Sequence, residues 1–412
     1  MCAQTCLIHA RGIYDSERRA IADADGMLIC DGRIEAISSF EWLLAQRPGV
    51  RQLDLSDCFL FPGLINTHVH LEFDASAKAR LHYLAGSEGG RILLAAEHAK
   101  QLLRSGVTTV RDAGSSWRAL DLLDEQVSRS ICLPRMQLAG PPLTVTGGHL
   151  HFLGEETDGV TDMVRQTRIR QKRGCGAVKL IVTGGQMTPG SVAERVSMTV
   201  GEIRAVTREA HSLGLRTFAH CLTTEGFVRC MEGGVDCIEH IACFKRNEGN
   251  RLLERVYEPE RMEPYQGAKR DFMMGLSAGY HNLDAYRDAE RACGANEAFW
   301  LEQEERMFSI FRRCVALGLR PVCGTDAGTG GTRFDETWLE LALMVERGGF
   351  TPAQAIAAGT ESAAACLGLE KVTGRLREGY DADVIALREN PLERIRALGC
   401  VRQVISRGTI VL

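Results

Sequence analysis

The sequence predicts an α/β protein built on a (β/α)₈ (TIM) barrel, with a small β-sandwich that both chain ends form together. Three observations lead to this prediction. Short apolar runs rich in Val, Ile, Leu and Thr alternate with longer segments of helical periodicity. The chain has eight such runs, and eight strand–helix repeats are the number that closes this barrel. The two chain ends lack helical periodicity and consist of strand-and-turn segments.

The predicted strands and helices follow from these runs in chain order. The strands are expected over residues 61–70, 108–114, 136–143, 177–185, 216–221, 237–241, 272–279 and 320–328. Helices are expected over residues 91–105, 158–173, 200–213 and 298–317. Gly106 stands where a C-terminal cap of the first helix is expected. A doubly wound parallel sheet is the alternative, but it needs a reversal of strand order, and the G-x-G-x-x-G fingerprint is missing after the first run.

The chain ends carry similar short segments, such as "GMLICDGRIEAIS" and "GRLREGYDADVIALREN". Each end alone is too short to bury a stable core. We therefore expect residues 1–60 and 370–412 to pair into one composite β-sandwich, beside a barrel of residues 61–369. Two separate β extensions are the alternative.

Composition narrows the class of protein. The chain has 412 residues, of which 45% are hydrophobic and 25% charged, with a net charge of −4. These values are typical of a soluble globular protein and disfavour a nucleic-acid or membrane partner. The N-terminal stretch lacks the pattern of a signal peptide. The fifteen cysteines are odd in number and scattered, without a C-x-x-C pair, which disfavours a disulfide framework or a zinc ribbon. We expect a cytoplasmic protein with reduced cysteines.

Polar residues stand at the strand ends, where barrel enzymes carry their active sites. They are His68 and His70 of the first strand, Lys179 of the fourth, His220 of the fifth, His240 of the sixth and Asp326 of the eighth. Residues i and i+2 of a strand share a face, so His68 and His70 project side by side. Each residue alone could be structural: a hydrogen-bonded histidine, an edge lysine or a turn aspartate. Together they would repel or stay unsatisfied unless something such as a pair of divalent metal ions compensates.

This set, H-x-H, Lys, His, His and Asp on strands 1, 4, 5, 6 and 8, resembles the amidohydrolase superfamily, and the resemblance covers nearly the whole chain. The phrases "TGGH", "VKLIVTGG", "IEH" and "GTDAG" are similar to the branch of Xaa-Pro and Xaa-Arg dipeptidases and imidazolonepropionase-like hydrolases. The resemblance implies two divalent metal ions, expected to be Zn²⁺. It places His68, His70 and Asp326 on the more buried ion and His220 and His240 on the second, with Lys179 bridging both after carboxylation by CO₂.

The resemblance also implies a reaction. We expect hydrolysis of an amide bond in a dipeptide or an N-acyl amino acid, by a hydroxide that bridges the metals, with Asp326 as proton shuttle. The alternative is hydrolysis of a xenobiotic or cyclic amide, a carbamate, an ester or a lactone at the same centre. A deaminase is disfavoured because deaminases of this superfamily usually hold one metal and lack the strand-4 lysine. A non-enzymatic assembly protein is disfavoured because all six ligands stand in the sequence.

Substrate contacts are expected from the loops that follow the strands. His149 and His151 follow the third strand, Tyr280 and His281 the seventh, and Arg333 the eighth. In the branch that the sequence resembles, a histidine in the first of these phrases binds the reacting carbonyl or the substrate carboxylate, so His149 is expected to be catalytic as well. Arg333 suits a bidentate grip on a carboxylate. Each could equally be a solvated loop residue. The long charged segment 242–319 is interpreted as a lid or an oligomer contact, and a homo-oligomer acting on a small molecule is expected.

Overall fold

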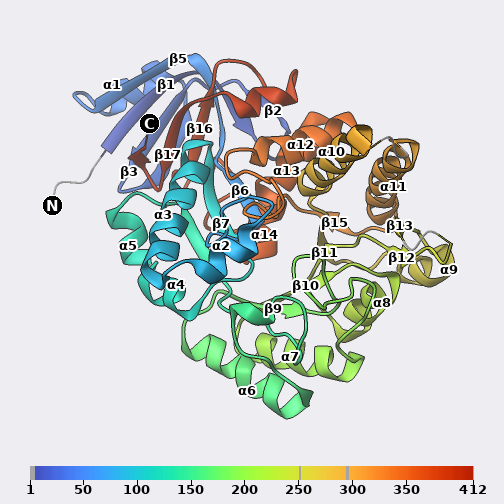
Figure 1. Ribbon diagram of the computed structural model, residues 1–412. Coiled ribbons are helices and arrows are strands. Elements are labelled where there is room, and N and C mark those ends of the chain that lie inside the picture. The colour runs from blue at the N-terminus through green and yellow to red at the C-terminus, as the bar shows by residue number, and fades with distance from the viewer. Residues whose placement is uncertain (1–4, 124, 250–251, 294–296, 412) are drawn as a thin grey trace.

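The computed structural model describes residues 5–123, 125–249, 252–293 and 297–411, and Figure 1 shows a ring of strands and helices beside a separate sheet. Each of the eight predicted strand runs overlaps a strand of the ring. These strands are β6 (Leu64–Val69), β7 (Val107–Asp112), β8 (Arg135–Leu138), β9 (Ala177–Ile181), β10 (Arg216–Cys221), β11 (Cys237–His240), β14 (Asp271–Met273) and β15 (Arg320–Pro321). The predicted barrel strands are thus present in the predicted order.

The ring strands pair in parallel and in chain order. One sheet has the order β6-β7-β8, and the other has β9-β10-β11-β14-β15. Neither order reverses, so the doubly wound alternative is wrong. Two parallel backbone bridges, Leu143 to Leu180 and Val69 to Ala327, lie where a closed barrel needs its two remaining contacts. Every residue of β6, β7 and β9 is buried, as expected of parallel strands that are covered on both faces.

Helices surround these strands. Four of them match the predicted helices: α3 (Glu88–Arg104), α6 (Gly159–Lys172), α7 (Val200–Ser212) and α11 (Glu297–Ala316). Gly106 has a φ of 97°, the left-handed conformation expected just beyond a helix end. The other helices are α2 (Ala79–Ala85), α4 (Trp117–Leu122), α5 (Glu125–Ser130), α8 (Thr224–Gly233), α9 (Pro259–Met262), α10 (Leu276–Cys293), α12 (Thr337–Glu346), α13 (Pro352–Ala358) and α14 (Glu361–Leu367), with 3₁₀ turns at His151–Leu153, Glu263–Tyr265 and Ile395–Gly399.

The long segment between β11 and β15 adds structure to one side of the ring. After β11 the chain forms a hairpin of β12 (Phe244–Arg246) and β13 (Leu253–Arg255), then α9, β14, α10 and α11. Figure 1 shows the hairpin beside α11. The segment therefore contains the predicted strand β14 and the predicted helix α11, together with a hairpin that sequence periodicity did not predict. Strands of three residues are too short to show a period.

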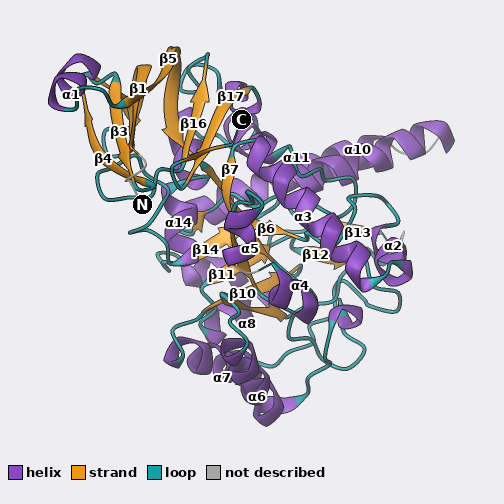
Figure 2. Cartoon of the chain, turned by 90° about the vertical axis from the view of Figure 1, so that its left-hand side faces the viewer, coloured by secondary structure: helices purple, strands orange, loops and turns teal. Residues whose placement is uncertain are grey.

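The two chain ends form one hydrogen-bonded sheet (Figure 2). Its strands are β1 (Thr5–Asp15), β2 (Ala20–Ala22), β3 (Gly26–Cys30), β4 (Arg33–Ser38), β5 (Arg51–Pro62), β16 (Val384–Leu387), β17 (Val401–Ser406) and β18 (Thr409–Ile410), with α1 (Phe40–Gln46) beside them. β5 pairs antiparallel with β16, which joins the two ends directly. An apolar core of the sheet includes Ile8, Met27, Leu60 and Ile405. The exact domain boundaries at residues 60/61 and 369/370 stay predictions.

Within the described part of the chain, no helix is long and apolar enough to cross a membrane. The cysteines described there are free, and most of them are buried. Burial raises the pKa of several of these thiols, including Cys58 to about 11 and Cys243 to about 12. Such thiols are protonated at neutral pH and pack as small apolar groups.

Asp383 connects the sheet of the chain ends to the barrel. Its carboxylate, buried just before β16, accepts hydrogen bonds from Arg135 Nη1 of β8 at 3.0 Å, Thr373 Oγ1 at 2.8 Å and the Arg407 backbone N–H at 2.9 Å. Arg135 also pairs with Asp381. The carboxylate thus joins a barrel strand to the C-terminal strands, and its removal leaves several donors without an acceptor.

We predict that Asp383→Ala lowers the free energy of unfolding by about 2–4 kcal/mol, because buried donors lose a charged acceptor. The matched control is Asp57→Ala, whose partner Arg388 is exposed, and it should cost far less than Asp383→Ala because water screens an exposed ion pair. Denaturant midpoints of both variants test the prediction. Equal shifts in the two variants would show that Asp383 does not hold the two parts together.

Candidate active site

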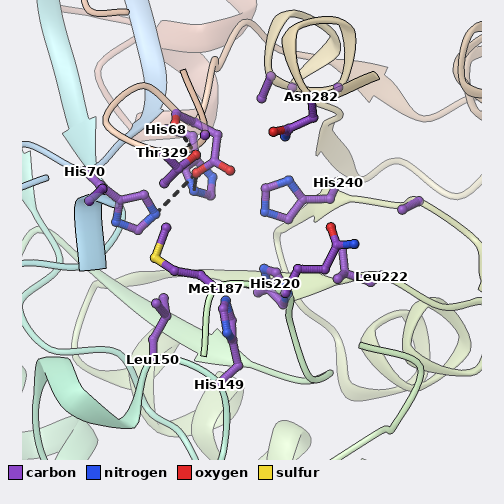
Figure 3. Close-up of a pocket in the computed structure, with 18 of the residues that line it drawn as sticks. His68, His70, His149, Leu150, Met187, His220, Leu222, His240, Asn282 and Thr329 are labelled. Carbon is purple, nitrogen blue, oxygen red and sulfur yellow. Dashed lines mark hydrogen bonds and ion pairs between the residues drawn. The ribbon is translucent and has the colours of Figure 1, made fainter. Parts of the chain in front are cut away.

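A cavity of about 760 Å³ opens at the carboxyl ends of the barrel strands (Figure 3). Its volume lies in the range of sites for small molecules. The wall includes all six predicted metal ligands and His149. The structure therefore brings together side chains from β6, β9, β10, β11 and the segment after β15, as the rule for barrel enzymes predicts.

Five imidazoles form an arc around this cavity (Figure 3). Neighbouring ring centroids are 5.3 Å apart for His70 and His68, 5.1 Å for His68 and His240, 4.9 Å for His240 and His220, and 4.7 Å for His220 and His149. So many imidazoles at this spacing would repel one another if protonated. Imidazole nitrogens gathered in this way are common metal ligands.

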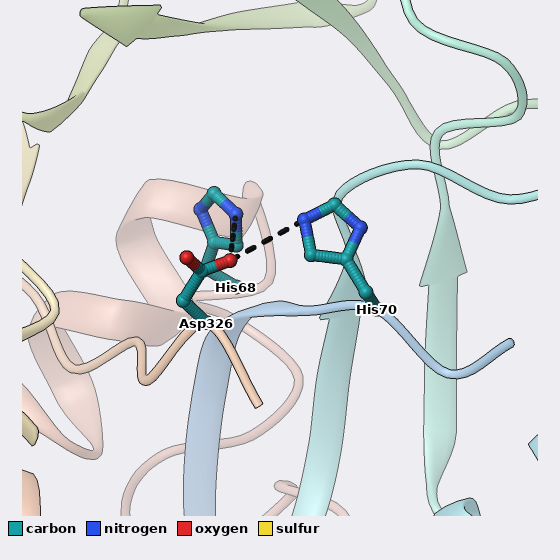
Figure 4. A group of neighbouring side chains, drawn as sticks. All are labelled: His68, His70 and Asp326. Atoms are coloured by element: carbon teal, nitrogen blue, oxygen red, sulfur yellow. Dashed lines mark ion pairs between the residues drawn. The ribbon is translucent and has the colours of Figure 1, made fainter. Parts of the chain in front are cut away.

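Asp326 faces His68 of β6 and His70, which directly follows β6 (Figure 4). Its Oδ1 atom is 3.3 Å from Nε2 of His68 and 3.3 Å from Nε2 of His70. The candidate ligand atoms of the three residues lie within 4.8 Å of one another. One divalent ion could be held by two imidazole nitrogens and one carboxylate oxygen of this kind.

Glu239 and Arg111 orient His68 from the barrel interior. Nδ1 of His68 hydrogen-bonds to the Glu239 carboxylate, and Arg111 Nη2 donates to that carboxylate at 2.9 Å. Burial would raise the pKa of Glu239, but His68 and Arg111 hold it at about 2. The ionised carboxylate accepts the Nδ1 proton, so Nε2 of His68 keeps its lone pair toward the cavity. Carboxylates of this kind orient histidine ligands in metal sites.

The backbone at two candidate ligands is strained. His240 has a φ of 73° and Asp326 a φ of 60°, a region that residues other than glycine rarely adopt. Ile241 and Cys243, which follow β11, also have positive φ values. Such conformations cost free energy and occur most often where a side chain must be aimed at a functional site.

Burial sets the protonation of the remaining ligands. It lowers the pKa of His240 to about 3 and that of His220 well below its usual value. Nε2 of His220 lies 3.1 Å from the Gly184 carbonyl oxygen, so Nε2 carries the proton and Nδ1 keeps a lone pair. Burial also lowers the pKa of Lys179 to about 8, although Glu239 and Asp326 oppose this shift. A neutral amine is the form that reacts with CO₂, so the donor set suits two divalent ions bridged by a carboxylated lysine.

His149 is held as a hydrogen-bond donor to the cavity. Burial lowers its pKa to about 3, so the ring is neutral. The Thr188 hydroxyl accepts from the Leu150 backbone N–H at 2.9 Å and lies 3.0 Å from His149 Nδ1. The hydroxyl proton is then available to Nδ1, which places the ring proton on Nε2. A Cβ atom at Gly185 would lie 2.5 Å from the ring, so only glycine leaves room for His149 in this position.

Four predicted substrate contacts do not line the cavity. Arg333 is exposed and forms two hydrogen bonds with Asp335, at 2.9 and 2.6 Å. His281 hydrogen-bonds to Glu336 at 3.1 Å, and His151 is half-buried near Glu156. Tyr280 packs against the main apolar core. In each case a nearby carboxylate or apolar neighbour holds the side chain outside the cavity, so the structure does not support substrate contact by these four residues.

Other cavity or supporting residues were missed from the sequence. They include Arg111, Glu239, Thr188 and Arg255. Arg111 and Glu239 could have been identified from the sequence, because each is a charged residue inside an apolar run, "TTVRDAG" and "CIEHI". Thr188 and Arg255 carry no such signal, because they lie in loop and hairpin segments whose contacts depend on the fold.

Comparisons with known proteins agree with this geometry. The profile of the Amidohydrolase family matches residues 59–411. Ochratoxinase of Aspergillus niger is 26% identical over 374 residues, which cover 82% of this chain and 72% of that protein. Imidazolonepropionase of Symbiobacterium thermophilum is 25% identical over 423 residues, covering 95% and 91%. The crystal structure of a Xaa-Pro dipeptidase with methionine bound in its active site has a TM-score of 0.83, with 26% identity and 99% of both chains covered. The chain therefore belongs to the amidohydrolase family and is a hydrolase that acts on carbon–nitrogen bonds.

Proposed function

We propose that this enzyme hydrolyses an amide bond in a dipeptide or an N-acyl amino acid at a centre of two divalent metal ions. One observation supports the proposal above the others: six side chains with metal-ligand chemistry meet on one buried cavity wall. His68, His70 and Asp326 would hold one ion, and His220 and His240 the other. Lys179, carboxylated, would bridge them. Such ions, when bound, activate water at neutral pH and polarise a carbonyl group.

Asp326 is the proposed proton shuttle. Burial opposes its ionisation, but the neighbouring imidazoles of His68 and His70 hold its pKa well below the usual value. Oδ1 faces both imidazoles, so Oδ2 is the atom that would take the proton of the attacking water and pass it to the leaving nitrogen. Transfer by a positioned carboxylate suits an amide, because its amine must be protonated to leave.

His149 is the proposed donor to the reacting carbonyl. Its Nε2–H faces the cavity because Thr188 occupies Nδ1. A neutral donor that is fixed before the reaction stabilises the charge that develops on the carbonyl oxygen. Thr188 acts through His149 and is a positioning residue.

The alternative substrates are a cyclic amide, a carbamate, an ester or a lactone. The similarity to imidazolonepropionase is compatible with a cyclic amide as the substrate. Rates for linear N-acyl amino acids against cyclic amides and lactones separate these reactions, because the same metal centre would serve all of them. Zinc as the metal, a cytoplasmic location and a homo-oligomeric state stay predictions.

We predict that the purified enzyme holds about two divalent ions per chain and that Lys179→Ala lowers this content and reduces turnover by about 10³-fold or more, because the bridge is lost. Short carboxylic acids should restore part of the turnover by supplying two oxygens. Elemental analysis and rate measurements test this, with the exposed Lys371→Ala as control. Full metal content and wild-type turnover in Lys179→Ala would exclude the bridging role.

We predict that Asp326→Asn lowers kcat by about 10²-fold or more, since an amide keeps the shape but cannot accept the proton. Asp335→Asn is the matched control, because Asp335 pairs with Arg333 outside the cavity. Steady-state rates of both variants at equal metal content give the comparison. A kcat near wild type in Asp326→Asn would assign the proton shuttle to another group.

We predict that Thr188→Val lowers kcat by about ten-fold or more with a smaller change in KM, because Nδ1 of His149 loses the hydroxyl that fixes its proton. Thr188→Ser keeps the hydroxyl and should retain most of the activity. A serine variant as impaired as the valine variant would indicate a packing role for Thr188 instead.

A further inference from the structure

We propose that Arg255 binds a carboxylate of the substrate, so that the enzyme prefers amides whose leaving amino acid has a free α-carboxylate and a large apolar side chain. The inference rests on the proposed function for the position of the reacting carbonyl. It assigns to the β12–β13 hairpin the role that the sequence suggested for Arg333.

Arg255 lines the cavity without a partner for its charge. Its Nε atom is buried and makes no hydrogen bond, and no carboxylate of a described residue pairs with its guanidinium. Burial lowers its pKa to about 10, so the group is still a cation at neutral pH. A half-buried arginine whose Nε has no hydrogen-bond partner leaves donors unsatisfied, and a ligand carboxylate could supply two charge-assisted hydrogen bonds.

The backbone and the ring beneath it hold Arg255 in place. Its N–H donates to Gln303 Oε1 at 2.7 Å, and its C=O accepts from Arg306 Nη1 at 3.0 Å, so both groups are fixed by α11. Phe244 is its direct partner across the hairpin, and the guanidinium carbon lies 4.9 Å from the centre of that ring. The cation is therefore positioned before a ligand arrives, which reduces the entropy cost of binding.

Two glycines at the start of α10 lie close to the candidate metal site and to Arg255, respectively. A Cβ atom at Gly275 would lie 3.9 Å from His240 Nδ1, and one at Gly279 would lie 3.9 Å from Arg255 Nη2. The two glycines are joined by a backbone hydrogen bond of 3.0 Å, and four helical residues span about 6 Å. His240 and Arg255 thus lie beside successive turns of α10, which suits a ligand that reaches from the candidate metal site to Arg255.

The cavity wall near His240 and Arg255 is apolar. Met274, Met307 and Ile310 line the cavity together with Phe244. Methionine side chains adapt their shape to bulky ligands. The absence of a side chain at Gly279 keeps the space beside Arg255 open, since a Cβ there would lie 2.3 Å from Met307 Sδ. The apolar wall therefore favours an aromatic or large aliphatic side chain next to the carboxylate.

Two other cations reach the same cavity. Lys78 and Arg80 lie at the start of α2 and line its rim. Lys78 is exposed, and Arg80 is half-buried, as is Arg255. The buried Nε atom without a hydrogen bond and the fixed backbone favour Arg255 as the carboxylate-binding residue, and an Arg80 variant tests this choice.

The experiment compares kcat/KM for N-acetyl-L-phenylalanine and N-acetyl-L-phenylalaninamide. The release of acetate measures the rate of each reaction. The wild type should prefer the acid by roughly ten- to a hundred-fold. Arg255→Met keeps the volume without the charge and should remove the preference, and Arg255→Lys should retain part of it. The control variant is Arg388→Met. Arg388 is an exposed arginine directly after β16, far along the chain from the hairpin, and this variant should behave as the wild type. Metal content and circular dichroism check folding, and Arg255→Gln replaces the methionine variant if that variant does not fold.

Equal rates for acid and amide in the wild type would overturn the inference, as would a preference that persists in Arg255→Met or disappears in Arg80→Met alone. A calorimetric measurement separates this from failure of the proposed function. If neither substrate is hydrolysed but L-phenylalanine binds more tightly than L-phenylalaninamide, and Arg255→Met removes that difference, the carboxylate site stands without the proposed reaction. Equal binding of both compounds would remove the site as well.

Discussion

The arrangement of the cavity depends on Glu239, the carboxylate buried between Arg111 and His68. Arg111 Nε also donates to the Thr67 carbonyl at 2.8 Å, and its guanidinium lies over the Phe218 ring. The contacts join β6, β7, β10 and β11 at the barrel centre. Because a buried charge needs a partner, removing any member would leave another charge unpaired. The same ion pair thus fixes the relative positions of the strands and the orientation of the first histidine.

The ion pair of Glu239 and Arg111 also affects the charge of the groups in the cavity above it. Glu239 opposes the loss of the proton from Lys179, whereas burial favours it. The imidazoles of His149 and His240 have no such carboxylate in direct contact, and burial keeps both neutral. The barrel therefore places the ionised carboxylate of Glu239 below the neutral imidazoles of His149 and His240. That distribution of charge suits cations placed in the cavity, because the donors face them without repulsion.

The barrel and its six candidate ligands could be predicted from the sequence because strand geometry is local. Alternation places His68 and His70 on one face, and parallel strands carry their ends to one rim. Substrate contacts depend on longer-range packing. Arg333 follows the last strand, but Asp335, two residues later, takes its guanidinium. Arg255 lies in a segment with several arginines and glutamates, and only the register of the hairpin, with Phe244 opposite, shows which arginine faces the cavity.

The barrel strands and the segment between β11 and β15 therefore have separate tasks. The strands and the loop after β15 carry the donor groups, while the hairpin, α10 and α11 form an apolar wall with one cation. Glutamine and arginine side chains of α11 bind the backbone of Arg255, not its guanidinium, so the charged head is left for a ligand. A change of side chain on this wall can alter the substrate without moving a strand that holds a donor. The barrel thus positions the candidate ligands, and the added segment forms the wall to which we assign the choice of substrate.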